Sequence, residues 1–302
     1  MARVVIGLNA VVTALVGGEP HVLCARRGDD RALPFGPFRP DDHRTFDLGM
    51  RALIEAQTGL APAYVEQLYT FGDEGREVAR ATLEGGEATD RVVSVGYLAL
   101  MREAGAAQAG AQWCPWYELF PYEDRRDGGA LPASLTQALD DWAADDPQRA
   151  ARAALAFGLG QHPWEEERAL DRYELLYEAG LVKEARRDGR ASAPLCVTGP
   201  AMTSDHRRIL ATAIGRLRGK LRYRPVIFEL MAEAFTLTEL QAATEGLLGF
   251  AVHKQNFRRA VTRSGLAEET GDTRAGPGRP AALFRRAGGA GVEGLTLPRL
   301  RD

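Results

Sequence analysis

Strand patterns dominate the first 120 residues of this chain, and helical patterns follow them. The strand-like segments are β-branched and apolar, and they lie at residues 4–16, 21–27, 65–71 and 92–101. Residues 92–101 are apolar almost throughout, so we expect them at the centre of a sheet. Residues 33–40 predict a loop, residues 47–58 predict a helix that ends at Gly59, and the aromatic residues 113–120 are expected to cover a sheet edge. The first domain is therefore expected to be α+β.

Between residues 131 and 188 the apolar residues recur at intervals of three and four, which is the helical period. This spacing predicts helices at residues 133–142, 147–157 and 163–179, the last of which ends at Gly180. The polar residues 186–192 predict a turn or a loop.

Length and composition favour a globular protein of more than one domain. A chain of 302 residues corresponds to about two domains. It contains no apolar run of about 18 residues, and its N-terminus lacks the features of a secretory signal, so neither a transmembrane helix nor a leader is expected. Cys24, Cys114 and Cys196 are odd in number and far apart, and they form neither a disulfide framework nor a CxxC zinc pattern. We expect buried thiols in a reducing cytoplasm.

The basic residues are concentrated near the C-terminus. Residues 206–286 contain 15 Lys and Arg against 7 Asp and Glu, whereas residues 1–205 contain 21 against 32. The formal net charge of −3 for the whole chain conceals this division. A compact basic segment on an acidic protein indicates a surface for a polyanion, the alternative being a solvated charged face.

The basic segment has the pattern of a helix-turn-helix. A long helical pattern, residues 206–231, is interrupted at Pro225. Thr236 and Glu239 have the spacing of a capping box, and the helix they begin is expected to stop at Gly249. After a short turn, residues 253–264 predict a third helix, with Gly265 as its stop. Two helices joined by such a turn form the helix-turn-helix layout.

The faces of the third helix indicate duplex DNA as the ligand. At about 100° per residue, Phe257, Ala260 and Val261 share one side. The opposite side and its flanks carry Gln255, Arg259, Thr262, Lys254, Arg258 and Arg263. Gln and Arg can read adenine and guanine edges, and Thr can touch a thymine methyl. A strand, a basic tip with Arg279 and a second strand follow, as in a wing, while Lys220, Arg222 and Arg224 are expected to clamp phosphates.

Two other interpretations of this segment remain open. One is a basic helical bundle with no ligand. The other is an RNA-binding or scaffold protein that uses the same basic surface. Phe257 is the one aromatic residue of the third helix and faces inward, so the helix offers no platform for stacking bases, and duplex DNA is favoured.

Residues 33–60 resemble the Nudix box, G-x5-E-x7-R-E-U-x-E-E-x-G-U, in which U is aliphatic. The first acidic position falls on Asp42, counted from Gly36. Counted back from Gly59 and Leu60, the box arginine falls on Ala52, and its three glutamates fall on Leu53, Ala56 and Gln57. The intervening stretch is two residues longer than the box, and Glu55 lies off the required face. Nudix hydrolysis needs clustered carboxylates to hold divalent cations, so the resemblance implies a retained fold with lost chemistry and no metal.

Further stretches resemble the Nudix-related transcriptional regulators of NAD metabolism, the NrtR- and NadQ-like proteins. These stretches are residues 67–73, 91–97, 220–230, 235–241, 256–259 and 278–281. The likeness covers roughly residues 4–120 and 218–285, and the long middle helices suggest the NadQ-like branch. It implies a Nudix-like mixed-sheet α/β/α sandwich, a helical connector and a C-terminal winged helix. The expected divisions are residues 1–128, 129–205 and 206–290, with a tail at 291–302.

The resemblance also implies a function. The protein is expected to be a homodimeric repressor of NAD biosynthesis or related genes that reads a palindromic DNA operator. Its front domain would sense an adenine nucleotide, with ADP-ribose, NAD and ATP as candidates and no cofactor. Arginines suit a diphosphate and aromatic rings suit adenine, so the candidate effector residues are Arg26, Arg39, Tyr69, Phe71, Asp73 and Arg76. Sheet packing of Tyr69 and Phe71 and a surface role for Arg26 are equally open.

The enzyme alternative is a Nudix hydrolase acting on a nucleoside diphosphate derivative, and the missing glutamate cluster argues against it. No other catalytic pattern stands out. The five histidines show no HExxH spacing, and the Gly-rich stretches lack a P-loop lysine. We therefore expect no catalytic residues.

Overall fold

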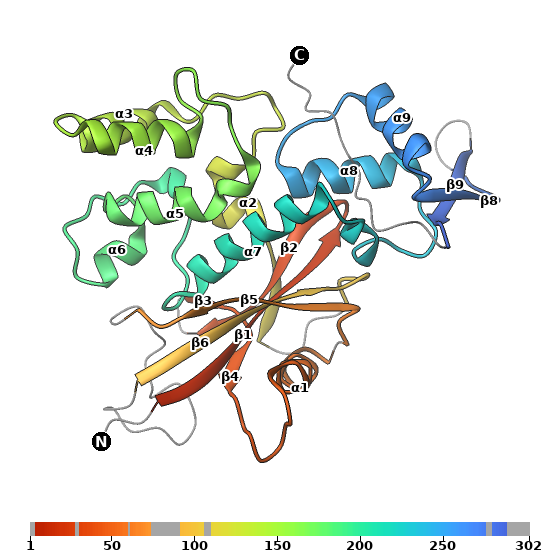
Figure 1. Cartoon of the computed structure of the whole chain (residues 1–302), viewed down its shortest axis with the longest axis horizontal. Helices are drawn as coiled ribbons and strands as arrows, with labels where there is room; N and C mark the ends of the chain where they lie inside the picture. The colour runs from red at the N-terminus through yellow and green to blue at the C-terminus, as the bar shows by residue number, and fades with distance from the viewer. Residues whose placement is uncertain are drawn as a thin grey trace.

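A mixed β-sheet forms the centre of the front half of the protein (Figure 1). The structure is a computed structural model, and it describes residues 4–27, 30–59, 61–73, 91–105, 110–275 and 280–288. The strands are β1 (Val4–Val16), β2 (Glu19–Arg27), β3 (Asp30–Ala32), β4 (Phe35–Pro37), β5 (Tyr64–Phe71), β6 (Arg91–Leu100) and β7 (Ala111–Pro115). Their order is β3-β2-β1-β6-β5, with β4 paired to β1 and β7 paired to β2. Strand β6 lies between β1 and β5 and runs parallel to β1, which confirms its predicted central position.

Two segments pair with distant strands, and the prediction did not include this pairing. The predicted loop at residues 33–40 contains β4, which pairs with Gly7–Asn9 of β1. The aromatic stretch begins in β7, which pairs along β2, and continues as α2 (Trp116–Leu119); Trp116 and Phe120 are fully buried. Local sequence patterns carry no signal for such long-range pairing.

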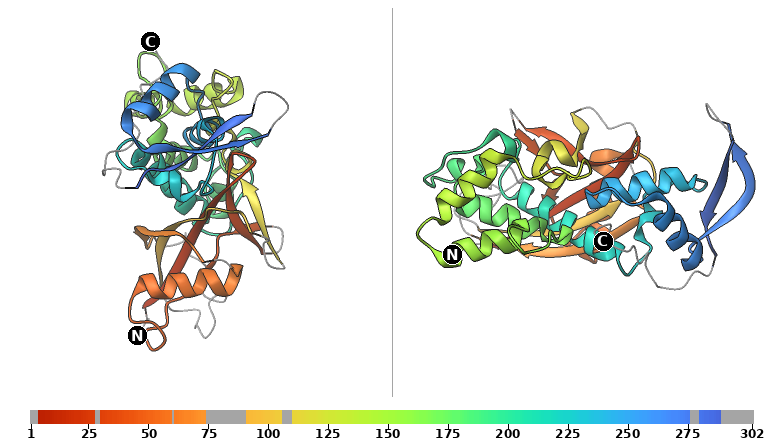
Figure 2. Two further views of the ribbon diagram at one scale, coloured as in Figure 1. Left: turned by 90° about the vertical axis from the view of Figure 1, so that its right-hand side faces the viewer. Right: turned by 90° about the horizontal axis from the view of Figure 1, so that it is seen from above.

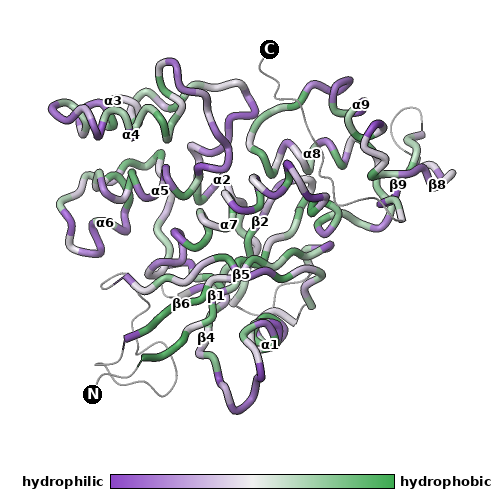
Figure 3. Tube along the Cα trace, viewed as in Figure 1, coloured by the Kyte–Doolittle hydropathy of each residue, from purple (hydrophilic) through white to green (hydrophobic). Residues whose placement is uncertain are grey.

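Helices cover both faces of the sheet. On one face α1 (Phe46–Thr58) packs through Met50 and Ile54 against β1. The Thr45 hydroxyl accepts the Leu48 N–H at 3.2 Å at its start, and Gly59, at φ 68°, ends it as predicted. On the other face lies α7 (His206–Leu221). Strands β1 and β6 are hydrophobic along most of their length (Figure 3), as expected of strands that are buried on both faces.

The middle of the chain is helical, as predicted; the helix at 147–157 has the predicted bounds, and the one at 133–142 extends one residue further. It contains α3 (Ala133–Ala143), α4 (Pro147–Phe157), α5 (Ala169–Glu178) and α6 (Lys183–Arg187), with short 3-10 turns η2 (Pro121–Glu123), η3 (Glu166–Arg168), η4 (Cys196–Thr198) and η5 (Val226–Glu229). The predicted helix at residues 163–179 starts only at Ala169, because η3 precedes it. Arg186 and Arg187, placed in a turn, lie in α6. Cys24 and Cys114 are buried as expected, but Cys196 is exposed.

The C-terminal part contains α8 (Leu237–Leu248), α9 (Lys254–Ser264), β8 (Ala267–Arg274) and β9 (Ala281–Arg286). Strands β8 and β9 form an antiparallel hairpin at the end of the molecule opposite α3–α6 (Figures 1 and 2). The capping box is present: the Thr236 hydroxyl accepts the Glu239 N–H at 3.1 Å, and the Glu239 carboxylate accepts the Thr236 N–H at 2.7 Å. Gly249 and Gly265 end the two helices at positive φ, as predicted. Among the described residues no helix combines the length and apolar character needed to cross a bilayer.

Replacing Thr236 by alanine is expected to lower the free energy of unfolding by about 1 kcal/mol, because the α8 N-cap loses its acceptor. Urea denaturation of the full chain measures this loss. Thr238→Ala is the matched control, since Thr238 is exposed in the first turn of the same helix. Equal losses in the two variants would contradict a capping role.

Candidate nucleic-acid interface and effector site

Helix α9 has one buried side and one exposed side, as its sequence predicts. Phe257 and Val261 are 1% and 2% exposed and join the main core. The opposite side is exposed and carries Gln255, Arg259, Thr262, Lys254, Arg258 and Arg263. The Gly249 cap and the short turn after it separate α9 from α8, which is the layout of a helix-turn-helix.

The exposed side of α9 is cationic, and its charge is not neutralised by any residue that the structure describes. The helix contains four Lys and Arg residues and no acidic residue. Neighbouring arginines are paired with carboxylates: Arg274 with Glu239 at 2.5 Å, and Arg285 with Glu268 at 2.8 Å. In the described part of the chain, no carboxylate lies within 4.0 Å of an α9 cation. An exposed helix that keeps its positive charge suits a phosphate backbone.

Arg259 has a neighbour that the sequence analysis did not single out. Its Nη2 donates to Oδ1 of Asn256, one helical turn earlier, at 2.6 Å. This contact orients the guanidinium, and among the described residues its other donors have no hydrogen-bond partner. The i,i+3 spacing of an amide and an arginine on one helix could have indicated the pair.

Two of the three residues expected to clamp phosphates, Lys220 and Arg222, have partners within the protein. The Lys220 ammonium is buried and bonds to the Glu66 carboxylate and the Tyr64 hydroxyl. Burial alone would lower the pKa of Lys220, but these partners raise it, so it is charged. Arg222 is paired with Glu166 at 2.6 Å and Glu167 at 2.8 Å. Both cations are paired with carboxylates within the protein, so the proposed DNA surface does not include them.

Arg224 and the wing tip complete the predicted set. Arg224 is exposed, and no carboxylate within ion-pair distance is found for it among the residues that the structure describes. The wing is present as β8 and β9. Arg279 lies outside the described residues.

Three of the candidate effector residues lie together at the end of β5. The Tyr69 and Phe71 rings meet edge-on, with centroids 5.6 Å apart, and Tyr69 is 63% exposed while Phe71 is buried. Asp73 accepts a hydrogen bond from Arg208 of α7, whose guanidinium lies 5.4 Å from the centre of the Phe71 ring. Arg208, which the sequence analysis missed, thus joins this group because α7 packs over the sheet.

The remaining effector candidates are more dispersed. Strand register places Phe71 beside Ser94, Ser94 beside Gly7, and Gly7 beside Pro37, so Arg39 follows at the same end of the sheet. Arg26 is exposed on β2. Its partner in the strand register is Arg31 of β3, so it does not lie beside Phe71, Ser94, Gly7 or Pro37. Arg76 lies outside the described residues.

Two of the Nudix-box positions of α1, Leu53 and Gln57, contact β4, while Ala56 is exposed. Leu53 lies so close to Gly36 that a Cβ there would be 2.8 Å from its Cδ1. The Gln57 side chain donates to the Phe35 carbonyl at 2.8 Å, while Asp42 and Glu55 are exposed. Among the described residues, no group of three His, Cys, Asp or Glu side chains could hold a metal ion.

The fold and these two sites define a class of protein: a mixed-sheet domain joined through helices to a winged helix whose second helix, α9, has an exposed cationic side. The family model of the NrtR DNA-binding winged helix domain matches residues 227–286. These residues are therefore an NrtR-type winged helix, as the sequence resemblance implied.

Relatives agree with this assignment. The "ADPR responsive transcriptional repressor NtrR" of Acinetobacter baylyi is 43% identical over 83 residues, which are 28% of this chain and 33% of that protein. The chain thus matches about a third of the length of this curated relative. Shewanella oneidensis NrtR, solved in complex with a 27mer DNA, matches with a TM-score of 0.56 and 22% identity over 93% of each chain. A MutT/nudix family protein from Enterococcus faecalis matches with a TM-score of 0.54 and 17% identity, over 95% of this chain and 88% of that one. The chain has the NrtR fold, a Nudix-like α+β domain followed by a winged helix, which confirms the predicted fold class.

Proposed function

We propose that this protein is a DNA-binding transcriptional repressor that responds to ADP-ribose and controls genes of NAD biosynthesis. The observation that carries the proposal is α9, whose exposed cations have no carboxylate partners among the described residues while the arginines of the wing strands are paired. The Acinetobacter relative supports ADP-ribose as the effector, because it is named an ADPR responsive transcriptional repressor. NAD and ATP are the competing effectors. We place the repressor in the cytoplasm with its DNA.

We propose that α9 enters the major groove with Gln255, Arg259 and Thr262 toward the base edges. The flanking cations would contact phosphates, and this set is Lys254, Arg258, Arg263, Arg224 and Arg279. The DNA-binding domain would begin near residue 227, where the family model begins, and not at His206, because α7 is buried between the sheet and α5.

We expect the front domain to bind nucleotides without cleaving them, since Leu53, Ala56 and Gln57 hold the glutamate positions of the Nudix box. ADP-ribose at ~100 times its Kd should stabilise the protein by about 2.7 kcal/mol. Thermal shift against ADP-ribose, NAD, NADP, ATP and nicotinate mononucleotide measures this. Incubation with ADP-ribose and Mg²⁺ or Mn²⁺ should release no AMP. Turnover above that of a mock-purified control would favour a Nudix hydrolase instead.

We expect a homodimer that reads a palindrome. Two recognition helices enter successive major grooves on one face of the duplex only if the half-sites lie about one turn, ~34 Å, or a multiple apart. Selection of DNA from a random library and light scattering of the complex test both points. Tight binding by a monomer to a single half-site would contradict the expectation.

A further inference from the structure

Three hydrogen-bond donors from other segments contact the carbonyls at the C-terminal end of α8. The Tyr117 hydroxyl of α2 donates to the Gly246 carbonyl at 2.5 Å, and Arg218 of α7 donates from Nε to the Leu247 carbonyl at 2.9 Å. The backbone N–H of Arg125 donates to the carbonyl of the cap residue Gly249 at 2.7 Å. The last carbonyls of a helix lack partners within it and carry the negative end of its dipole, so a cation there is well placed.

Arg218 is in turn held by a buried carboxylate. Glu123 accepts from Arg218 through Oε2 and from Nε of Arg172 through Oε1 at 2.6 Å, and these three side chains are at most 1% exposed. Burial alone would raise the pKa of Glu123, but the two guanidinium groups lower it, so it is ionised. The cluster has one excess positive charge, which faces backbone carbonyls, among them those of Leu247 and Glu166. Removal of Glu123 would leave two guanidiniums facing each other out of water.

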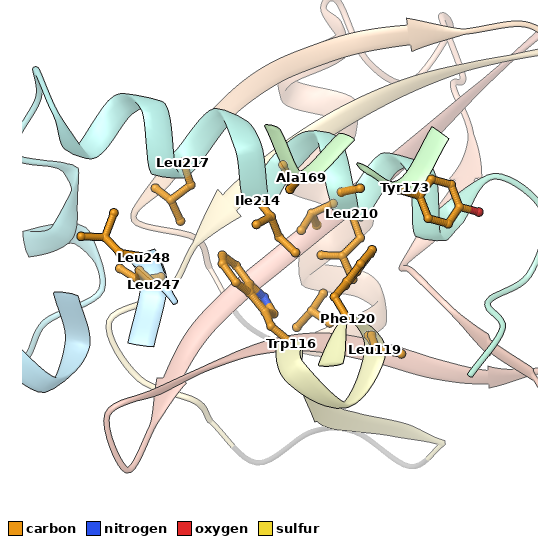
Figure 4. Close-up of a cluster of buried hydrophobic side chains, with 14 of the residues drawn as sticks. Trp116, Leu119, Phe120, Ala169, Tyr173, Leu210, Ile214, Leu217, Leu247 and Leu248 are labelled. Carbon is orange, nitrogen blue, oxygen red and sulfur yellow. The ribbon is translucent and has the colours of Figure 1, made fainter. Parts of the chain in front are cut away.

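The backbone at the C-terminal end of α8 is closely packed against the rest of the protein. A Cβ at Gly249 would lie 2.4 Å from the Glu123 carbonyl oxygen, and a Cβ at Gly246 would lie 2.8 Å from the Gly18 carbonyl oxygen. Side chains of α7 and α8, including Leu217 and Leu247, converge with Trp116 in one core (Figure 4). The orientation of α8 is therefore set by the front domain and α7, because close-packed interfaces do not deform continuously.

We propose that Glu123 is a positioning residue for DNA recognition: by holding Arg218 against the end of α8, it fixes the orientation of α8 and of the reading helix α9 that follows. The proposal rests on the proposed function. A rotated α9 no longer presents its base-reading side chains in register with the groove. Its exposed cations still attract any duplex, because phosphate attraction carries no sequence information. Loss of orientation therefore affects specific binding more than general binding.

The test compares Glu123→Gln with Glu184→Gln. Glu184 is equally buried and pairs with Arg207 of α7 at 3.2 Å, but its described partners, Arg207 and the Met202 N–H, do not lie in α8. Each full-length variant is titrated with the duplex that the wild type selects from a random library and with a random duplex, at a temperature where circular dichroism shows it folded. Glu123→Gln should bind the selected duplex at least ~10-fold more weakly and the random duplex within about threefold of the wild type. Glu184→Gln should bind both within about threefold.

Tyr117→Phe provides a milder variant if Glu123→Gln does not fold, since it removes one hydroxyl. Burial raises the pKa of Tyr117 to about 12, so the hydroxyl is protonated and donates to Gly246. Its loss should weaken specific binding about fivefold and leave random binding unchanged. Wild-type specificity in every folded variant would overturn the inference, as would equal loss in Glu184→Gln. If the wild type selects no duplex, the proposed function itself fails.

Discussion

Alanine at Arg259 should weaken binding to the selected duplex by about 5- to 150-fold and should leave binding to random DNA almost unchanged. The guanidinium is exposed on α9 opposite the buried Phe257 and is oriented by Asn256, so it is placed to make a bidentate contact to a guanine edge. Such a contact favours guanine over another base at that position by about 1–3 kcal/mol of binding free energy. Binding isotherms at several salt concentrations, on both duplexes, measure the effect.

Arg263→Ala is the control for Arg259→Ala. Arg263 is exposed in the last turn of α9, where the side chain is suited to a phosphate and not to a base. Its loss should weaken binding to both duplexes alike. The slope of log K against log salt concentration should fall in magnitude by about one unit. If Arg259→Ala also lowered specific and random binding equally, α9 would not be the reader, and the wing near Arg279 would replace it as the candidate.

Alanine at Phe257 should destabilise the winged helix by about 3–5 kcal/mol. Phe257 and Val261 are the two buried residues of α9, so the ring supplies most of the apolar surface that attaches this helix to the core. DNA binding should be lost, whereas the ADP-ribose-induced thermal shift of the front domain should persist. Chemical denaturation, followed by hydrogen exchange of α9 amides, measures the loss.

The exposed position Thr262 gives the matched control for Phe257. Thr262→Ala leaves the buried side of α9 intact and should change the free energy of unfolding by less than about 0.5 kcal/mol. A comparable loss in both variants would show that α9 is not anchored through Phe257.

The local features of the winged helix could be predicted from the sequence. The Thr236 and Glu239 capping box, the stop at Gly249 and the buried side of α9 each depend on residues within one or two turns of each other. Helical periodicity and capping act over that range, so the residues themselves carry the signal. The exposed side of α9 follows from the same periodicity, so the spacing of its residues predicts which of them are exposed.

The partners of the basic residues could not be predicted in this way. Lys220 and Arg222 are cations of the kind that contact phosphates. They pair instead with Glu66 and Glu166, which are 154 and 56 residues away in sequence. The pairing of β4 with β1 also joins distant residues. Whether a charge faces solvent or another charge depends on which elements pack together, and periodicity within one element does not encode that.

The sequence by itself determined the α+β front domain, the helix-turn-helix and the cationic side of α9, because each is encoded by short-range spacing. Only the tertiary structure decided which of the described cations pair with carboxylates and how α8 is held. That division arises because Glu123, Arg172 and Arg218 come from three separate segments, and burial brings them together. The attachment of α8 to the rest of the protein therefore depends on the packed molecule and not on any single segment.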